Sequence, residues 1–323
     1  MRSLGHEVDT VRIAFNPAVP AAIRSAMDYA LREDTARWIA GPDVVIGLRF
    51  PAYLVQHPTK RVWLLHQLRQ YYEYFDETRR GAADPQECER LRDEIVAADR
   101  AAFEGASRLW AQSRRISERA EFYTGVAPAP VLGPPLPLED CFYRGRQDAY
   151  IFAPSRLERH KRQWLLIEAM AHVKSPVKAV IGGSGGAWTD CMKRIEKLGL
   201  QDRVLLTGPL AQEVLASWYA NAMAVFFGPE DEDYGFVALE AMLSGKPVIT
   251  CTDSGGSLDF ISDRANGFVV EPDAREIAAR IDELARDPRR AASMGDAGYD
   301  RYRSLGLTWE KTALELLAPG GNA

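Results

Sequence analysis

Short apolar runs rich in β-branched residues alternate along the chain with longer stretches in which apolar residues recur at helical spacing. This alternation is typical of a parallel sheet whose strands are joined by crossover helices. In the first half of the chain it predicts strands at 8–13, 44–48 and 62–65, and helices at 21–39 and 85–103.

A proline-rich passage at 128–137 interrupts the periodicity, and the same alternation restarts after it. Because proline removes backbone donors and restricts φ, this passage predicts a linker between two domains. In the second half the pattern predicts strands at 149–153, 177–181, 204–206, 224–227, 248–250 and 268–270. The predicted helices between them lie at 163–172, 189–198, 212–221 and 235–244.

These patterns predict an α/β protein of two Rossmann-like domains, at 1–140 and 141–305, followed by an amphipathic helix within 306–323. The length of 323 residues agrees with two domains, since one domain commonly holds roughly 150 residues. Apolar residues make up 46% of the chain and charged residues 26%, which is ordinary globular composition.

Charge and the length of the apolar runs limit the classes of partner, and the cysteines indicate the compartment. A formal net charge of −5 argues against a nucleic-acid binder. Five arginines cluster nonetheless, either on one solvated helix face or on a surface for an anionic lipid or acidic acceptor: Arg100, Arg108, Arg114, Arg115 and Arg119. The apolar runs are shorter than the roughly 20 residues of a membrane span, which is compatible with peripheral membrane contact. Four cysteines without a Cys-x-x-Cys pair, and no basic-then-apolar leader, predict reduced thiols in a cytoplasmic protein.

Ligands of a doubly wound parallel sheet gather at the carboxyl ends of its strands. In the second half, the residues directly after the predicted strands are glycine, arginine, hydroxyl and acidic residues. These side chains suit a phosphate and a sugar better than an apolar ligand. The strand ends therefore predict where a site lies.

Glu232 lies in the loop after a predicted strand, and Glu240 follows eight residues later inside the next predicted helix. That helix begins near Gly235, so its free amides and the positive end of its dipole suit a phosphate. Carboxylates beside such a spot can accept hydrogen bonds from sugar hydroxyls. On spacing alone, the two glutamates also fit ordinary surface charge.

Three other sets of residues follow predicted strands. Arg156 and Lys161 can converge on a diphosphate, or they mark an exposed basic helix start. The glycines at 182–186 allow close approach of a ligand, or form a plain flexible turn. His66 stands at the end of a strand in the first half, where it is either a structural residue or part of a site.

The run from Glu232 to Glu240 resembles the Glu-x7-Glu motif of the retaining family 4 glycosyltransferases, which have the GT-B fold of two Rossmann-like domains facing a cleft. The resemblance implies that Glu232 contacts the donor sugar and that Glu240 holds the ribose hydroxyls. It also implies that the amides of Gly235, Phe236 and Val237 lie near the diphosphate.

The segment from Ser155 to Lys161 resembles the family's Gly-Arg-x-x-x-x-Lys element, with Ser155 where glycine is usual. This implies that Arg156 and Lys161 stabilise the leaving diphosphate. Gly182 and Gly183 resemble the family's small glycine turn.

The first half and the C-terminus carry looser resemblances. His66 resembles the family's histidine that faces the donor sugar from the acceptor domain. Arg69, Tyr71 and Tyr72 are then acceptor-side candidates, although helix packing explains the tyrosines equally well. Trp309 with the helix at 310–317 resembles the terminal segment that crosses back onto the first domain, and an ordinary C-terminal helix is the alternative.

The activity implied is transfer of a hexose from a UDP- or GDP-sugar to an acceptor hydroxyl, with retention of the anomeric configuration. No cofactor other than the donor is implied, and no metal site is predicted. Asp231 and Asp233 flank Glu232, but the Glu-x7-Glu register already accounts for that loop. The implied acceptor is a glycan, a glycolipid or a small molecule, as in bacterial cell-surface polysaccharide synthesis.

Two other functions fit a nucleotide-sugar site. A sugar-nucleotide epimerase of the same architecture would bind a similar donor, and a non-catalytic partner subunit would bind nucleotide without transferring anything. A flavin or nicotinamide enzyme is disfavoured, because no Gly-x-Gly-x-x-Gly with a suitably placed acidic residue follows a strand.

The chain departs from the family pattern at its start. The segment from Met1 to Val8 resembles the end of the family's first helix and the start of its second strand. We therefore expect about 30 residues of the family pattern to be absent before it, including a first strand and a glycine-rich loop. The first domain is accordingly expected to be incomplete.

Overall fold

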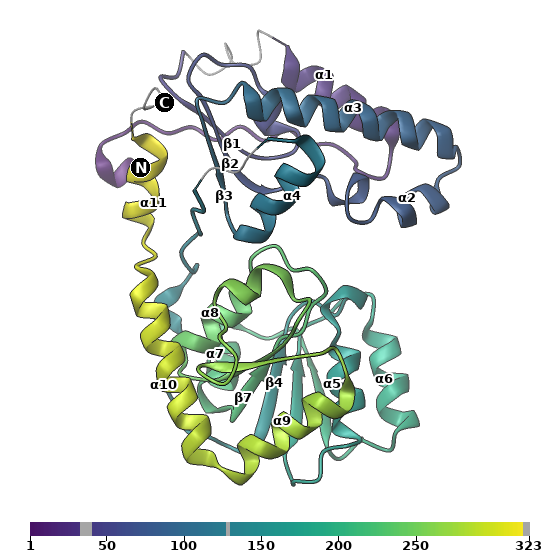
Figure 1. Cartoon of the computed structure of the whole chain (residues 1–323), viewed down its shortest axis with the longest axis vertical. Helices are drawn as coiled ribbons and strands as arrows, with labels where there is room; N and C mark the ends of the chain where they lie inside the picture. The colour runs from purple at the N-terminus through teal and green to yellow at the C-terminus, as the bar shows by residue number, and fades with distance from the viewer. Residues whose placement is uncertain (33–40, 127–129, 319–323) are drawn as a thin grey trace. The chain divides into compact units, whose positions relative to one another are not determined.

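The computed structural model describes residues 1–32, 41–126 and 130–318. The chain forms two compact units (Figure 1). The first unit consists of Met1–Pro135 together with Thr308–Ala323, and the second of Leu136–Leu307. The boundaries predicted from sequence, after residues 140 and 305, lie a few residues from these.

The second unit is built on one six-stranded parallel sheet of order β6-β5-β4-β7-β8-β9. Its strands are β4 (Tyr150–Pro154), β5 (Lys178–Gly182), β6 (Val204–Gly208), β7 (Ala224–Phe226), β8 (Val248–Cys251) and β9 (Gly267–Val270). The chain first runs outward from β4 to β6, then returns to place β7 on the other side of β4. The order of the strands therefore reverses between β4 and β7.

Helices cover both faces of this sheet (Figure 1). They are α5 (Gln163–Met170), α6 (Trp188–Lys197), α7 (Gln212–Asn221), α8 (Phe236–Leu243), α9 (Ala274–Arg286) and α10 (Pro288–Leu305). Successive residues of a strand point to opposite faces, so Ile151 of β4 packs in one core cluster with α5, α6 and α9. The next residue, Phe152, packs in the other cluster with α7 and α8. Burial on both faces explains why the strands read as continuous apolar runs.

The sequence prediction for this half is confirmed. All six predicted strands and all four predicted helices are present, and their ends differ from the prediction by at most two residues. Strong apolar runs and helical periodicity predicted these elements well, because the strands inside the sheet, such as β4, β7 and β8, are buried on both sides.

The first unit has a three-stranded parallel sheet of order β1-β2-β3. Its strands are β1 (Val45–Arg49), β2 (Lys60–His66) and β3 (Arg108–Ala111), and its helices are α1 (Pro20–Leu31), α2 (Phe75–Gly81), α3 (Pro85–Glu104), α4 (Arg114–Thr124) and α11 (Trp309–Leu317). A core of aliphatic and aromatic side chains includes Ile23 of α1, Leu64 of β2 and Leu91 of α3. This core joins α1 and α3 to the central strand.

Two predictions for the first half are wrong. Residues 8–13, predicted as a strand, have no regular secondary structure, since their apolar positions do not alternate and none pairs with the sheet. The clustered arginines do not share one helix face: Arg100 belongs to α3, Arg108 to β3, and Arg114 to α4. Strand β3 itself was missed because it is only four residues long and opens with an arginine.

Two other predictions fall partly on residues that the structure does not describe. The predicted helix at 21–39 corresponds to α1, which ends at Leu31, and positions 33–39 lie outside the described residues. Of the proline-rich passage, 128 and 129 also lie outside them. Its next residues run beside β3, where the Leu132 amide donates to the Ala111 carbonyl at 2.9 Å. Leu136 is buried in the core of the second unit.

The terminal helix α11 packs on the first unit. The Arg61 guanidinium donates to the carbonyl of Leu316, and the indole N–H of Trp110 lies 3.4 Å from Glu315 Oε1. Trp63, Trp110 and Leu316 form a small apolar cluster there. Among the described helices, none has the length and apolar content needed to cross a membrane.

Candidate functional site

The reversal of strand order between β4 and β7 defines a switch point in the second unit. In open α/β sheets, ligands bind in the crevice outside the carboxyl ends of the strands at such a point. Strand β4 ends at Pro154 and β7 at Phe226. The segments 155–162 and 227–235 therefore border the crevice, and they carry four of the predicted site residues.

Lys161 and Glu232 meet at this switch point. The Lys161 Nζ donates to Glu232 Oε2, and the two side chains are only 11% and 17% exposed. Lys161 Nζ also lies 5.9 Å from the centroid of the Phe227 ring. A cation and a carboxylate from segments 71 residues apart are thus held together where a ligand is expected.

The loop that carries Glu232 is fixed on both sides by backbone hydrogen bonds. On one side, the Glu230 amide donates to the His160 carbonyl at 2.7 Å. On the other, the Gly256 amide donates to the Glu232 carbonyl at 2.7 Å. A Cβ on Gly255, whose φ is +59°, would stand 2.4 Å from that same oxygen, so this close approach requires glycine.

The glycine turn after β5 packs against the segment after β4. The Ser155 amide donates to the Gly182 carbonyl at 3.0 Å, and the Gly183 amide to the Gly208 carbonyl at 2.9 Å. A Cβ on Gly183 would stand 1.9 Å from the Ser155 carbonyl oxygen. Close approach of two protein backbones accounts for Gly183.

Helix α8 begins at the switch point. Gly235 is its N-cap, in the left-handed region at φ +96°, and no side chain caps the helix. The backbone amides of the first turn, which begins with Phe236 and Val237, thus donate to no capping side chain. Such an uncapped helix start suits an anion.

Glu240 lies farther along α8 and is partly buried. Its Oε2 accepts a hydrogen bond from the hydroxyl of Tyr219, a fully buried residue of α7. Burial raises the pKa of Glu240, and the Tyr219 hydrogen bond opposes that rise. Sequence reasoning missed Tyr219, because a tyrosine on an apolar helix face carries no signal of such a contact.

The two arginines of the segment after β4 differ in their environment. Arg156 is exposed, and among the described residues its guanidinium has no ion-pair partner. Its carbonyl accepts a 2.9 Å hydrogen bond from Gln163 Nε2, which fixes the backbone. Arg162, to which the sequence assigned no role, forms a two-bond pair with Asp253.

The site residues predicted in the first unit differ in their burial and in their partners. His66 is the last residue of β2, partly buried, with its Nδ1 2.8 Å from the Gln67 carbonyl oxygen. Arg69 lies 3.4 Å from Glu73 Oε2. Tyr72 is 3% exposed and donates its hydroxyl to Asp99 at 2.7 Å. Tyr72 is therefore a core residue whose hydroxyl is bonded to Asp99.

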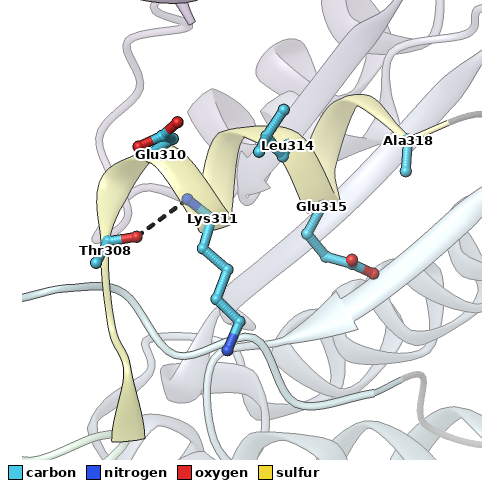
Figure 2. A pocket seen from close by; sticks show the side chains of 6 residues that line it. All are labelled: Thr308, Glu310, Lys311, Leu314, Glu315 and Ala318. Atoms are coloured by element: carbon cyan, nitrogen blue, oxygen red, sulfur yellow. Dashed lines mark hydrogen bonds between the residues drawn. The ribbon is translucent and has the colours of Figure 1, made fainter. Parts of the chain in front are cut away.

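A hollow of about 470 Å³ lies beside α11 and is lined by Thr308, Glu310, Lys311, Leu314, Glu315 and Ala318, none of which is a predicted site residue (Figure 2). Figure 2 shows the side chains of Lys311 and Glu315 on one side of the helix and those of Glu310 and Leu314 on another. They do not converge on one point. Among the described residues, there is no group of three or more histidine, cysteine or acidic side chains arranged for a metal ion.

Comparisons with known proteins agree with the fold. Residues 144–301 match the family model described as glycosyl transferases group 1. A D-inositol 3-phosphate glycosyltransferase of Xylanimonas cellulosilytica is 30% identical over 175 residues, which cover 52% of this chain and 40% of that relative. The chain thus aligns with less than half the length of this curated relative.

Solved structures match more of the chain at lower identity. Sucrose-phosphate synthase of Thermosynechococcus elongatus superimposes with a TM-score of 0.70 and 22% identity, over 92% of this chain and 77% of that one. Anabaena HepE in complex with UDP and glucose gives a TM-score of 0.61 and 18% identity, over 80% and 86%. At such identities these matches show the fold.

Two α/β units, each built on a parallel sheet, give the protein the GT-B fold. Residues 144–301 are similar to the group 1 glycosyltransferases.

Proposed function

We propose that this protein is a glycosyltransferase that moves a hexose from a UDP- or GDP-sugar to an acceptor hydroxyl, with retention of configuration. The observation that carries the proposal is the pairing of Lys161 with Glu232 at the switch point, beside the uncapped start of α8. A cation and helix amides suit a diphosphate, and a carboxylate suits sugar hydroxyls.

In the proposed donor complex, the diphosphate binds Arg156, Lys161 and the amides at 235–237. Arg156 has an exposed guanidinium, and Lys161 exchanges its carboxylate partner for the phosphate. These groups stabilise the charge that develops on the leaving diphosphate. This arrangement needs no divalent metal, and no cofactor besides the donor substrate is proposed.

Release from Lys161 leaves Glu232 able to accept hydrogen bonds from the donor sugar. The proposed role of Glu240 is to hold the ribose, with Oε1 facing the nucleotide while Oε2 stays on Tyr219. In the first unit, His66 and Arg69 lie at or just after the carboxyl end of β2, and they are proposed for sugar and acceptor binding.

The transfer step retains the configuration at the anomeric carbon when the acceptor attacks that carbon from the same face from which the diphosphate departs. The acceptor oxygen forms its bond to the anomeric carbon as the bond from that carbon to the diphosphate oxygen breaks. The acceptor proton goes to the departing phosphate oxygen, so the products are a glycoside and a nucleoside diphosphate. No protein nucleophile takes part. The proposed acceptor is a glycan, a glycolipid or a small polyhydroxyl molecule.

Calorimetric titration of the full chain with UDP, GDP and ADP tests the donor site. We expect selective binding of one nucleotide, weakened at least about tenfold in Arg156→Ala and Glu240→Ala, as loss of a charged hydrogen bond predicts. A folded chain that binds none of the three would contradict the proposal. Release of that nucleotide from its sugar donor, with transfer to an added acceptor, then separates an enzyme from a protein that only binds.

A further inference from the structure

Arg162 has an unusual backbone conformation for its residue type. It follows the 3₁₀ turn Arg159–Lys161 and is the N-cap of α5, with φ +54° and ψ +34°. This is the left-handed region, which residues with a Cβ rarely adopt without support. Since Arg162 lies between Lys161 and α5, its conformation sets the direction in which the chain runs from Lys161 into that helix.

A two-bond ion pair supplies the support. Arg162 Nη1 and Nη2 donate to Asp253 Oδ1 and Oδ2, each at 2.8 Å, and Nη2 lies 3.6 Å from Glu230 Oε2. The Arg162 side chain is 11% exposed. Most surface ion pairs contribute little, but a two-bond pair with one largely buried partner is held in a single geometry.

This pair spans the loop that carries Glu232. Arg162 belongs to the segment after β4 and Asp253 to the segment after β8, while Glu232 lies in the segment after β7, between them in the sheet order. Two backbone bonds brace the same loop: from the Glu230 amide to the His160 carbonyl at 2.7 Å, and from the Asp231 amide to the Asp253 carbonyl at 2.9 Å. The ion pair and these bonds form a frame around residues 230–232.

We propose that Arg162 and Asp253 are a positioning pair: they hold residue 162 in its left-handed conformation and thereby fix Lys161 and Glu232 for the donor diphosphate and sugar. The ligand part of this inference rests on the proposed donor site. Both terminal nitrogens of Arg162 already bond Asp253, which favours positioning over direct contact with the diphosphate.

Amide hydrogen exchange of the ligand-free full chain tests the frame itself. Arg162→Ala loses the pair and keeps a Cβ in the left-handed region, whereas Arg162→Gly loses the pair but adopts that region freely. We expect the Lys161 and Glu230 amides to exchange at least about tenfold faster in Arg162→Ala and in Asp253→Asn. We expect the same amides to exchange at least about fivefold more slowly in Arg162→Gly than in Arg162→Ala. This factor corresponds to the lower bound of the free-energy cost of the left-handed conformation for a residue with a Cβ.

Arg194→Ala is the matched control, because Arg194 pairs with Glu168 between two helices of the same unit, outside the frame. It should leave exchange at Lys161 and Glu230 unchanged. Equal exchange in wild type, Arg162→Ala and Asp253→Asn would overturn the proposal, as would Arg162→Gly exchanging as fast as Arg162→Ala.

Titration of the same variants with UDP and GDP tests the link to the donor. We expect the affinity loss to follow the exchange series, with Arg162→Gly binding at least about fivefold more tightly than Arg162→Ala. Equal losses in the two variants would assign Arg162 to direct contact and overturn positioning. If wild type binds neither nucleotide, the proposed function fails for these donors, while hydrogen exchange still decides whether the pair holds the frame.

Discussion

The hydroxyl of Tyr219 donates a hydrogen bond to the carboxylate of Glu240, joining α7 to α8 inside the second unit. Tyr219 is fully buried and packs edge-on against Phe152 of the central strand, with ring centroids 5.1 Å apart. The tyrosine is therefore held in one position by the core. It fixes one carboxylate oxygen of Glu240, and in the proposed donor complex the other oxygen contacts the ribose.

Tyr219→Phe removes this hydrogen bond with little change in volume. Burial raises the pKa of Glu240 and the Tyr219 bond lowers it, so the variant should have a still higher pKa at Glu240. If the ionised carboxylate binds the ribose, nucleotide affinity should fall as the pH is lowered and Glu240 is protonated. The midpoint of this fall should lie at a higher pH in Tyr219→Phe than in wild type. Calorimetric titration across the acidic range, with the nucleotide that wild type binds, measures this midpoint.

Tyr150→Phe is the control for this experiment. The Tyr150 hydroxyl donates to the Trp218 carbonyl at 2.8 Å in the same core cluster and does not touch Glu240. It should lower thermal stability, by about 1 kcal/mol for one hydrogen bond, without moving the pH midpoint. Equal midpoints in wild type and Tyr219→Phe would remove Tyr219 from the site.

Glu232→Gln should have opposite effects on nucleotide binding and on transfer. In the ligand-free chain Lys161 is paired with Glu232, so a diphosphate must displace that carboxylate. Without the charge, affinity for the nucleoside diphosphate should rise by up to about fivefold, the upper range for a partly exposed pair. Transfer from the sugar donor should fall, because the amide accepts hydrogen bonds from the sugar more weakly.

Lys161→Met is the companion variant. It removes the cation and leaves Glu232 without a partner, so nucleotide affinity should fall rather than rise. Titration and a coupled assay of nucleotide release measure both effects. Weaker nucleotide binding in Glu232→Gln would contradict the competition between carboxylate and diphosphate.

Asp99 should make the stability of the first unit depend on pH. It is fully buried and accepts hydrogen bonds from Tyr53 and Tyr72, and burial raises its pKa from 3.8 to about 7. The folded state therefore holds this proton more tightly than the unfolded state. Stability should fall as pH rises from about 4 to about 7, and this contribution should be constant above that range.

Asp99→Asn removes the titrating group and keeps an oxygen acceptor for the tyrosines. Denaturant unfolding of wild type and Asp99→Asn at a series of pH values measures this effect. Between the unfolded and folded pKa values of Asp99, the free energy of unfolding of wild type should fall more steeply with pH, by up to about 1.4 kcal/mol per pH unit. Parallel curves for the two chains would mean that Asp99 does not titrate in this window.

The second unit could be predicted from sequence almost entirely, because the strands inside its sheet are buried on both faces and leave apolar runs. Strand ends then gave the location of Lys161 and Glu232, although their pairing needs the fold. The first unit was harder. Its strand β3 is short and begins with Arg108, and the apolar positions near Val8 do not pair with any strand.

Contacts made only in three dimensions explain what the sequence could not give. Nothing in the spacing links Tyr219 to Glu240 or Arg162 to Asp253, which are 91 residues apart. Tyr72 followed a strand end, as a ligand-binding residue would, yet its hydroxyl is turned inward to Asp99. Position along the chain predicts the edge of a sheet, while the direction of a side chain depends on its partners.

Gly183→Ala should damage the second unit far more than Gly186→Ala, although both glycines belong to the same run. At Gly183 the φ is +126°, and an added Cβ would stand 1.9 Å from the Ser155 carbonyl oxygen. The strained conformation alone costs about 1–3 kcal/mol, and displacement of Ser155 adds to it. At Gly186 the nearest atom to an added Cβ is Glu158 Oε2, at 3.8 Å, which is ordinary contact. Thermal unfolding of the two variants measures the difference, and nucleotide titration of Gly183→Ala should show weaker binding because Ser155 precedes Arg156. Similar melting temperatures for the two variants would mean that the turn after β5 does not pack on the segment after β4 in this way.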